Sequence, residues 1–433
     1  TLEKGHGHDE SGGKLGQLYA RVAHRVIDTR KSARNFLIGV GVATLVACSM
    51  FYFKAVTVKL LPFDNKSEVQ VVVDMPEGTA LENTGRVLED VAGVVRGLPE
   101  ATAMEAYVGT SAPFNFNGLV RHYFLRSQPE QGDVMVTLLP KGERSRSSHQ
   151  IALDLRQRLK ALKLPETASI KVVETPPGPP VLATLLAEVY GPDAATREKT
   201  ATELEKIFKS VPFIVDVDNS FGTPRPKLRL DIQRDRIDYY GLSQRQIADS
   251  IGMLMGSQTV GYAPRGDGRT PLPITIALEQ KDRSWTQALS STPVAQTPGG
   301  QLIVLGAVAD ARTETGSPAI FRRDGRYADM VTAELAGAYE APIYGMLAVD
   351  RAVDDHDWAA QGLVKPQIRL NGQPEDESVP SMLWDGEWEI TWVTFRDMGG
   401  AFMVALLGIY ILVVAQFRSF RLPLVILTPV PLT

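Results

Sequence analysis

Two long runs of uncharged, mostly apolar residues constrain this chain more than any other feature of its sequence. Residues 36–53 read FLIGVGVATLVACSMFYF, and residues 398–417 read MGGAFMVALLGIYILVVAQF. A helix needs about 20 apolar residues to cross the hydrocarbon core of a bilayer, and about 17 is the lower limit. The first run taken alone is also compatible with a helix buried in a protein core. The second run favours a membrane protein, as does a third, LPLVILTPVPLT, that begins at residue 422.

Basic residues beside the runs predict how the chain is oriented in the membrane, because short cytoplasmic segments carry an excess of Lys and Arg. Arg30, Lys31 and Arg34 precede the first run, and Arg418 and Arg421 follow the second. Both flanks are therefore expected in the cytoplasm. Residues 55–395 would then lie on the opposite side, which is the periplasm in a Gram-negative bacterium.

The residues before the first run divide into two segments. In residues 1–13 glycines interrupt the potential metal ligands His6 and His8, so we expect a flexible linker and no metal site. The segment begins with polar residues, and no signal peptide is expected there. Residues 14–35 place apolar and basic side chains on different faces of a helix, which predicts an amphipathic helix on the inner membrane surface. A surface helix packed on protein has the same pattern.

Composition excludes several classes of function. The net charge is −4, with 46 basic and 50 acidic residues, so there is no basic excess for a nucleic acid partner. Cys48 is the single cysteine, which excludes an intramolecular disulfide and a cysteine-based metal site. No P-loop, G-x-S-x-G or HExxH motif is present. We therefore expect neither an enzyme nor a bound cofactor.

Between the first two runs, an order of strand, turn, helix and strand occurs twice. The expected elements lie at 67–75, 80–97 and 101–109 in the first copy, and at 187–191, 194–210 and 213–218 in the second copy. A repeat of this size predicts two related α+β subdomains, each with a split βαβ, ferredoxin-like layer. Further elements complete the first copy: strands at 122–127, 132–140 and 168–174 and a helix at 147–161.

The second copy resumes only after a long separate block, with strands expected at 326–335 and 388–392. This spacing predicts a domain inserted into the second copy. Within the block, Ser243 is a candidate N-cap of a helix. The strings TVGYA and PLPITIAL flank the turn at 264–269, which indicates a long hairpin. Such a hairpin is suited to clasping a neighbouring subunit, although a plain surface hairpin has the same signature.

The order of these parts and four of their strings resemble the resistance-nodulation-division (RND) efflux permeases. The strings are LLPFDNKSEVQVVVDMPEGTALENTGRVLEDV (60–91), DRIDYYGLSQRQIADSI (235–251), LIVLGAVADARTETGSPAIFRRDGRYADMV (302–331) and VVAQFRSFRLPLVILTPVPLT (413–433). With the two spans, they cover nearly the whole chain. The chain resembles the front part of the permease's second half, and we expect it to be a partial chain of a longer permease.

The resemblance implies membrane α-helical spans plus an α+β periplasmic domain. The implied parts are a cytoplasmic linker (1–13), an amphipathic surface helix (14–35), the seventh span (36–54), a first porter subdomain (58–174), a second porter subdomain in two parts (175–222 and 324–395), an inserted docking subdomain (223–323), the eighth span (397–417) and the start of the ninth (420–433).

The resemblance also implies a function and partners. The chain would be part of a homotrimer in the cell inner membrane that exports hydrophobic or amphiphilic small molecules by proton antiport, with a periplasmic adaptor protein and an outer-membrane channel. In this family the proton relay uses an acidic pair on the fourth span and a lysine on the tenth. Neither span belongs to this chain, and its two longer apolar runs hold no charged residue. We therefore expect no proton relay within it.

The stretch SAPFNFNG at 111–118 contains the candidate substrate contacts. Two aromatic residues in an irregular Pro/Asn/Gly loop are poor core material. In multidrug members of the family a loop here with the same F-x-F pattern separates the drug pockets. By that resemblance Phe114 and Phe116 contact substrate, and Phe124 is a further candidate, because aromatic faces accept varied ligands. Alternatively, the rings pack under their own loop.

Other readings of the sequence remain open. Members that export copper or silver carry methionines near 122–123 and 181–182, where this chain has His122, Tyr123, Val181 and Leu182, so that substrate class is not expected. A divalent heavy-metal exporter of the same family is an alternative, since His122 and scattered carboxylates are present. Outside the family, the alternatives are a periplasmic ligand-sensing domain of a membrane receptor and an assembly scaffold without transport. A receptor should continue into a signalling helix, whereas here another apolar run follows.

Overall fold

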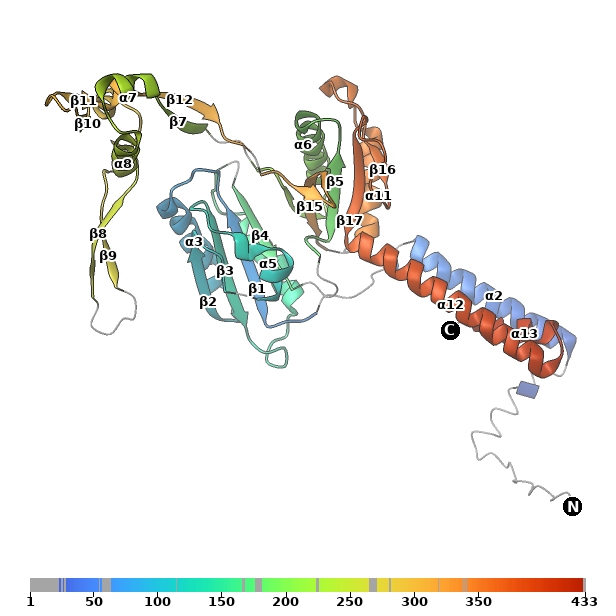
Figure 1. Ribbon diagram of the computed structural model, residues 1–433. Coiled ribbons are helices and arrows are strands. Elements are labelled where there is room, and N and C mark those ends of the chain that lie inside the picture. The colour runs from blue at the N-terminus through green and yellow to red at the C-terminus, as the bar shows by residue number, and fades with distance from the viewer. Residues whose placement is uncertain are drawn as a thin grey trace, which may run out of the picture. The chain divides into compact units, whose positions relative to one another are not determined.

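The computed structural model describes residues 23–24, 26, 29–53, 55–56, 64–113, 115–165, 168–175, 181–222, 226–264, 271–279, 282–317, 319–337, 339 and 341–430 (Figure 1). The chain divides into two compact units. One comprises Thr1–Phe221 and Ile320–Thr433, and the other comprises Gly222–Ala319, which we call the insert unit. The larger unit contains two sheets. We call residues 64–175 the first lobe, and residues 181–221 with 320–386 the second lobe.

The first lobe is a four-stranded antiparallel sheet in the order β2-β3-β1-β4. Its strands are β1 (Glu68–Asp74), β2 (Ala101–Val108), β3 (Gln131–Leu138) and β4 (Ser169–Val173), and its main helices are α3 (Leu81–Arg96) and α5 (Ser148–Leu159). The alternating valines of β1 explain the packing, because Val69, Val71 and Val73 share one buried cluster with the apolar faces of both helices. Ser147 starts α5 with a capping box.

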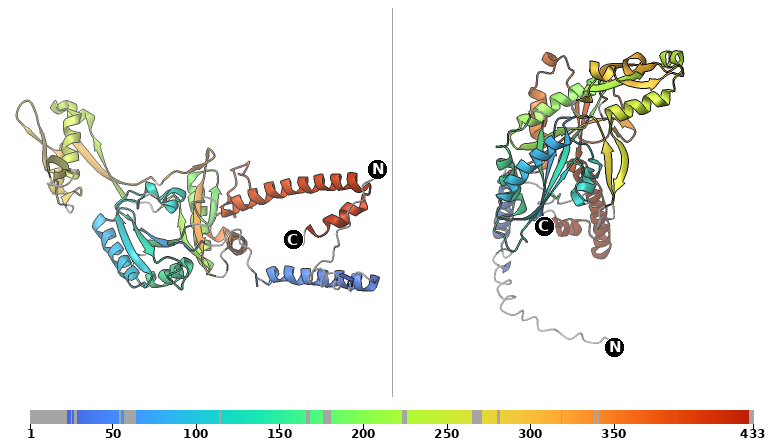
Figure 2. Two further views of the ribbon diagram at one scale, coloured as in Figure 1. Left: turned by 90° about the horizontal axis from the view of Figure 1, so that it is seen from below. Right: turned by 90° about the vertical axis from the view of Figure 1, so that its left-hand side faces the viewer.

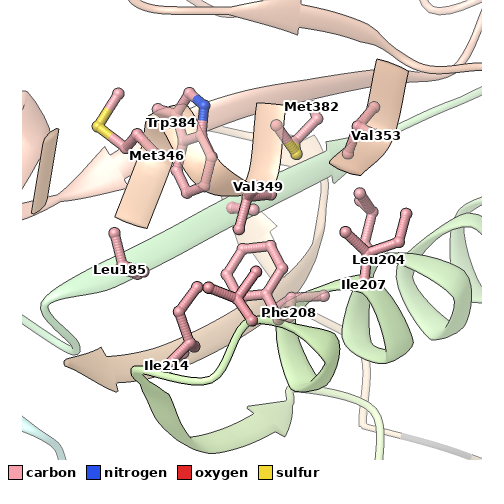
Figure 3. Close-up of a cluster of buried hydrophobic side chains, with 14 of the residues drawn as sticks. Leu185, Leu204, Ile207, Phe208, Ile214, Met346, Val349, Val353, Met382 and Trp384 are labelled. Atoms are coloured by element: carbon pink, nitrogen blue, oxygen red, sulfur yellow. The ribbon is translucent and has the colours of Figure 1, made fainter. Parts of the chain in front are cut away.

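The second lobe is a five-stranded sheet in the order β16-β17-β5-β15-β6. Its strands are β5 (Leu185–Tyr190), β6 (Ile214–Asn219), β15 (Asp329–Leu335), β16 (Gln367–Arg369) and β17 (Ser381–Gly386), and its main helices are α6 (Ala194–Ser210) and α11 (Pro342–Asp355). Side chains of the sheet and both helices meet in one core (Figure 3). The rings of Phe208 and Trp384 lie 5.8 Å apart in it. Without β16, the sheet reads β6-β15-β5-β17 from its other edge. The second, third, first and fourth strands of the lobe, counted along the chain, thus follow one another across the sheet, as β2-β3-β1-β4 do in the first lobe.

Two strands predicted between the long apolar runs are wrong. Residues 122–127 form the short 3-10 helix η1 (Tyr123–Leu125), which follows α4 (Phe116–Val120) after His122 adopts a left-handed φ of 57°. Residues 388–392 belong to the helix α12 (Glu387–Phe417). The side chains of Trp388, Ile390 and Trp392 alternate as in a strand, but acidic residues in this first turn suit the positive end of a helix dipole.

Two helices among the described residues are long and apolar enough to cross a membrane: Arg30–Met50, within α2 (Arg30–Tyr52), and α12. Their side chains are not buried within the protein. α12 begins at Glu387, before the predicted start at 397, and is unbroken to Phe417. A short helix, α13 (Arg421–Leu427), turns back after it (Figure 2). The predicted linker and residues 14–22 of the predicted surface helix lie outside the described residues.

The insert unit is built around the antiparallel pair β7 (Pro226–Ile232) and β12 (Ala309–Thr315). Its other elements are α7 (Arg234–Tyr240), α8 (Gln244–Met255), β8 (Gln258–Ala263), β9 (Leu272–Ile276), α9 (Gln287–Ser290), β10 (Pro293–Gln296), β11 (Leu302–Val304) and α10 (Leu305–Val308). Strands β8 and β9 form an exposed hairpin. Ser243 occupies the N-cap position of α8, but its side chain makes no capping hydrogen bond. The remaining short strands are β13 (Arg322–Arg323) and β14 (Arg326–Tyr327) of the second lobe.

The second-lobe core yields a stability prediction. Replacing Phe208 by Ala should lower the free energy of unfolding by about 3–5 kcal/mol, because the buried ring leaves a cavity against Trp384. Leu347→Ala on exposed α11 surface is the control, with an expected change within about 0.5 kcal/mol. Denaturant unfolding of the detergent-solubilised chain, followed by tryptophan fluorescence, measures both. Equal effects of the two changes would contradict this account of the core.

Candidate functional site

A cavity of about 310 Å³ lies between the first and second lobes. It is lined by Arg121, His122, Tyr123, Leu125, Arg126, Lys171, Val173, Leu182, Ala183, Asp216, Asp218, Asn219, Ser220, Phe321, Met330, Thr332, Ala333 and Glu334. The strands β4 and β6, each at the edge of its own sheet, lie against one another beside it. The cavity is therefore a cleft at the junction of the two sheets.

The two walls of the cleft carry opposite charges. The first lobe contributes the cationic side chains, Arg121, Arg126 and Lys171. The second lobe contributes the carboxylates, Asp216, Asp218 and Glu334. Arg121 and Lys171 pair with Glu334 and Asp218 of the second lobe, so ion pairs contribute to the contact between the lobes.

One buried ion pair between the lobes joins Arg121 to Glu334. Arg121 follows α4 and Glu334 lies on β15, and their nearest atoms, Nη1 and Oε1, are 2.5 Å apart. The side chains are only 9% and 12% exposed. Thr184 donates a hydrogen bond of 2.6 Å to the other oxygen of Glu334. Burial alone would raise the pKa of Glu334, but Arg121 and Thr184 hold it below its ordinary value.

A second contact joins the two edge strands. Lys171 of β4 pairs with Asp218 of β6 and, at 3.2 Å, with Asp74 of its own lobe. Burial alone would lower the pKa of Lys171, but Asp218 and Asp74 raise it, so the amine stays charged. An inward-pointing charge of this kind also discourages edge strands from pairing through their backbones.

A third contact depends on an unusual backbone conformation. Asp216 has a left-handed φ of 55°, and the pairing of β6 with β15 shifts register beside it. Such a bulge redirects a side chain out of the regular alternation. The Asp216 carboxylate accepts a 2.8 Å hydrogen bond from Nη2 of Arg156 on α5 of the first lobe. Burial raises the pKa of Asp216 above its ordinary value, and Arg156 only partly opposes this.

Arg126 fixes the segment 111–127 to the first-lobe sheet. Its guanidinium contacts Asp74 at 2.6 Å and Asp133 at 3.1 Å, and it donates to the carbonyl oxygen of Val73 at 2.9 Å. Asp133 also accepts a hydrogen bond from the backbone N–H of Ala112. These bonds hold both ends of the segment that carries Arg121, so this wall of the cleft is preorganised.

Two of the predicted substrate contacts, Phe116 and Phe124, occupy the same segment but do not line the cavity. Phe114 lies outside the described residues. Phe116 begins α4 and is 45% exposed, and Phe124 in η1 is 40% exposed. The ring of Phe124 meets that of His122 edge-on at 5.9 Å. That these phenylalanines bind substrate stays a prediction.

Sequence reasoning missed the charged residues of the cleft. The signal was present in two strands, because Lys171 interrupts the apolar string SIKVV and two aspartates alternate in FIVDVD. Charges inside otherwise apolar strands are rare unless they are paired. In the part of the chain that the structure describes, no group of three or more His, Cys, Asp or Glu side chains is arranged to hold a metal ion.

Comparison with known proteins identifies relatives over most of the sequence. The sequence model of the AcrB/AcrD/AcrF family matches residues 12–343. The cobalt-zinc-cadmium resistance protein CzcA of Cupriavidus metallidurans is 22% identical over 58% of this chain and 22% of its own length. An uncharacterized transporter of Haemophilus influenzae is 21% identical over 97% of this chain and 36% of its own length. The chain therefore spans about a fifth to about a third of the length of these relatives.

A solved structure has the same fold. The crystal structure of a heavy metal efflux pump superposes with a TM-score of 0.70 at 20% sequence identity. The match covers 96% of this chain and 40% of that protein. At this identity the likeness concerns the fold alone.

The buried ion pair of the cleft yields a prediction with an internal test. Arg121→Ala should lower the free energy of unfolding by about 3–5 kcal/mol, because Glu334 is left buried without its cation. Adding Glu334→Gln to that variant should restore part of the loss. Lys209→Ala, which breaks an exposed pair with Glu205, is the control and should cost at most about 1 kcal/mol. Denaturant unfolding measures all three, and a double variant no more stable than Arg121→Ala would contradict the prediction.

Proposed function

The chain belongs to the AcrB/AcrD/AcrF family of RND permeases, and from that premise we propose that it is part of an inner-membrane efflux permease that takes up substrate from the periplasm. The observation that carries the proposal is the cleft between the two lobes, a cavity of about 310 Å³ whose walls belong to separate sheets. A site between two separately folded lobes is able to admit a ligand when the lobes move apart. The protein's role is transport without chemical transformation of the substrate.

The proposal assigns a role to each part of the chain. The first and second lobes are the two porter subdomains, and their shared strand order supports this assignment. The insert unit is the docking subdomain. The helices α2 and α12 are the seventh and eighth spans, and α13 begins a ninth, so that the chain is multi-pass. The large domain between α2 and α12 is then periplasmic.

The exposed hairpin of the insert unit supports a contact with a neighbouring subunit. The strands β8 and β9 display apolar side chains on their surface, including Val260, Tyr262, Ile274 and Ile276. An exposed apolar ribbon of this kind is a feature of interaction sites. We assign it to the neighbouring copy in a homotrimer, which works with a periplasmic adaptor protein and an outer-membrane channel.

Hydrophobic or amphiphilic organic molecules are the proposed substrates. The cleft lining mixes charged side chains with the apolar Leu125, Leu182 and Phe321. The stretch of the first lobe that includes the lining residues 121–126 also exposes Phe116, Leu119 and Phe124, which supply the large apolar contact area that such molecules require. Export would be driven by protons that enter through parts of the permease outside this chain.

Divalent heavy-metal cations are the second candidate substrate. The carboxylates of the cleft, Asp216, Asp218 and Glu334, draw their cations from the opposite lobe. If the lobes separate, the second-lobe wall is left with three carboxylates, which are hard oxygen ligands suited to a cation. The names of relatives such as CzcA, and of a putative cation efflux protein SilA of Salmonella typhimurium that is 27% identical over 38% of this chain, agree with this alternative.

Complementation separates the two substrate classes. A strain that lacks the full-length gene is complemented with the wild-type gene or with Phe116→Ala, Phe124→Ala, Asp216→Asn or Asp218→Asn, and its tolerance of organic amphiphiles and of Co²⁺, Zn²⁺ and Cd²⁺ is measured. The phenylalanine variants should lower amphiphile export at least about fivefold, because loss of an aromatic contact costs about 1 kcal/mol or more. Tyr239→Ala, an exposed aromatic of the insert unit, is the control.

The outcomes discriminate between the candidates. Restored metal tolerance that only the aspartate variants abolish would replace the first candidate by the second. If the wild-type gene restores tolerance to neither substrate class, the exporter proposal is wrong.

A further inference from the structure

Three carboxylates surround one guanidinium where the second-lobe sheet passes into α12. Arg323 of β13 contacts Glu188 of β5, Asp385 of β17 and Glu389 in the first turn of α12. Each of the three nearest nitrogen–oxygen distances is 3.2 Å. Four separate elements therefore meet at this cluster, which lies away from the cleft lining.

The cluster carries more negative charge than its cation neutralises. Three ionised carboxylates and one guanidinium leave two negative charges, and the side chains of Glu188 and Asp385 are only 2% and 11% exposed. The other polar groups nearby do not supply a cation. Asp324 adds a further acid, and the Tyr190 hydroxyl donates a 2.6 Å hydrogen bond to Glu188 while it accepts one from the Gln373 amide. Like charges at this spacing cannot all remain ionised in a buried place.

One buried carboxylate oxygen of the cluster lacks a hydrogen-bond donor in the described part of the chain, and a proton on a neighbouring carboxyl group would supply one. Oε1 of Glu188 is buried and has no hydrogen-bond donor among the described residues, since Arg323 approaches it only as an ion pair. Asp385 and Glu188 lie on the same face of the paired strands β17 and β5, two positions apart in register, and both contact Arg323. Burial raises the pKa of Asp385 above its ordinary value, and Glu188 adds to the rise although Glu389 opposes it. Two carboxyl groups in contact form a hydrogen bond only when one of them carries a proton.

Gly386 makes the cluster sensitive to the position of α12. It joins β17 to α12 with a φ of 72° and a ψ of −135°, and Asp385 and Glu389 lie on its two sides. A Cβ at this position would approach the carbonyl oxygen of Ala183 to 2.6 Å, so the close approach demands glycine. A rotation at this one residue changes the separation of the Asp385 and Glu389 carboxyls.

We propose that Glu188, Asp385 and Glu389 bind one proton between them and that this proton holds the first turn of α12 against the second-lobe sheet. Loss of the proton leaves the carboxylates to repel one another, and Glu389, the half-exposed member, moves away with the first turn of α12. The stabilising contribution is complete at low pH and is lost as the pH rises through the raised pKa of Asp385. The inference goes beyond the proposed export function and does not depend on the substrate.

Fluorine NMR of the full chain tests the proposal in lipid nanodiscs. The five tryptophans are replaced by 5-fluorotryptophan, and Trp388→Phe assigns the signal of Trp388, whose ring donates to the carbonyl oxygen of Leu370 beside the cluster. This resonance should shift along one sigmoid between about pH 5 and about pH 9, the range in which shifted carboxyl groups titrate. The buried Trp384 signal reports that each variant is folded.

Matched variants decide the outcome. Glu389→Gln and Asp385→Asn should each remove the sigmoid and hold the Trp388 signal at its low-pH position, because a neutral amide replaces the protonated group. Glu377→Gln, which removes a partly exposed partner of Arg326 outside the cluster, should leave the sigmoid unchanged. Arg323→Gln should raise the midpoint by about one pH unit or more. A flat wild-type response up to about pH 9, or a sigmoid that survives in both amide variants, would overturn the proposal.

Discussion

Among the described residues, pairs of opposite charge join the two lobes of the larger unit, and no backbone hydrogen bond does so. β4 and β6 are edge strands that lie against one another, and edges of this kind readily pair into a continuous sheet. Lys171 in β4, with Asp216 and Asp218 in β6, places charge along this contact instead. A contact made of side-chain ion pairs separates without breaking the hydrogen bonds of either sheet. The cleft exists because the sheets end here and do not merge.

The elements that the sequence predicted well are those whose pattern is local. The helix over 194–210 has an aspartate cap at Asp193 and a proline just after its end, and it spans Ala194–Ser210 in the structure. β17 was missed because all of its residues are buried, so it shows no alternation of polar and apolar side chains. The stretch 388–392 does alternate, yet it is helical because it continues into the long apolar helix that follows. The long helix that follows therefore decides the conformation of this stretch, and the local alternation does not.

The candidate site was less accessible to sequence reasoning, because its chemistry depends on partners that are distant in the chain. Arg121 and Glu334 are 213 positions apart, and Lys171 and Asp218 are 47 positions apart. Composition counts these charges but does not show which of them are buried together. The aromatic pattern at 111–118 led instead to Phe114, Phe116 and Phe124. The side chains of this stretch of chain that line the cavity lie instead at 121–126.

The cleft and the start of α12 share a short piece of backbone. Leu182 and Ala183 line the cavity, and the carbonyl oxygens of Ala183 and Thr184 crowd Gly386. Thr184 donates to Glu334 of the cleft and also lies 3.5 Å from the carboxylate of Glu387, the first residue of α12. A displacement of the second-lobe wall that moved residues 182–184 would therefore change the contacts of Gly386, which joins β17 to α12. Proximity alone does not establish coupling, which requires an element with two arrangements that both places bias. Under the proposal made above, the glycine joint with its excess of carboxylates is such an element, because binding of one proton changes the balance of attraction and repulsion across it.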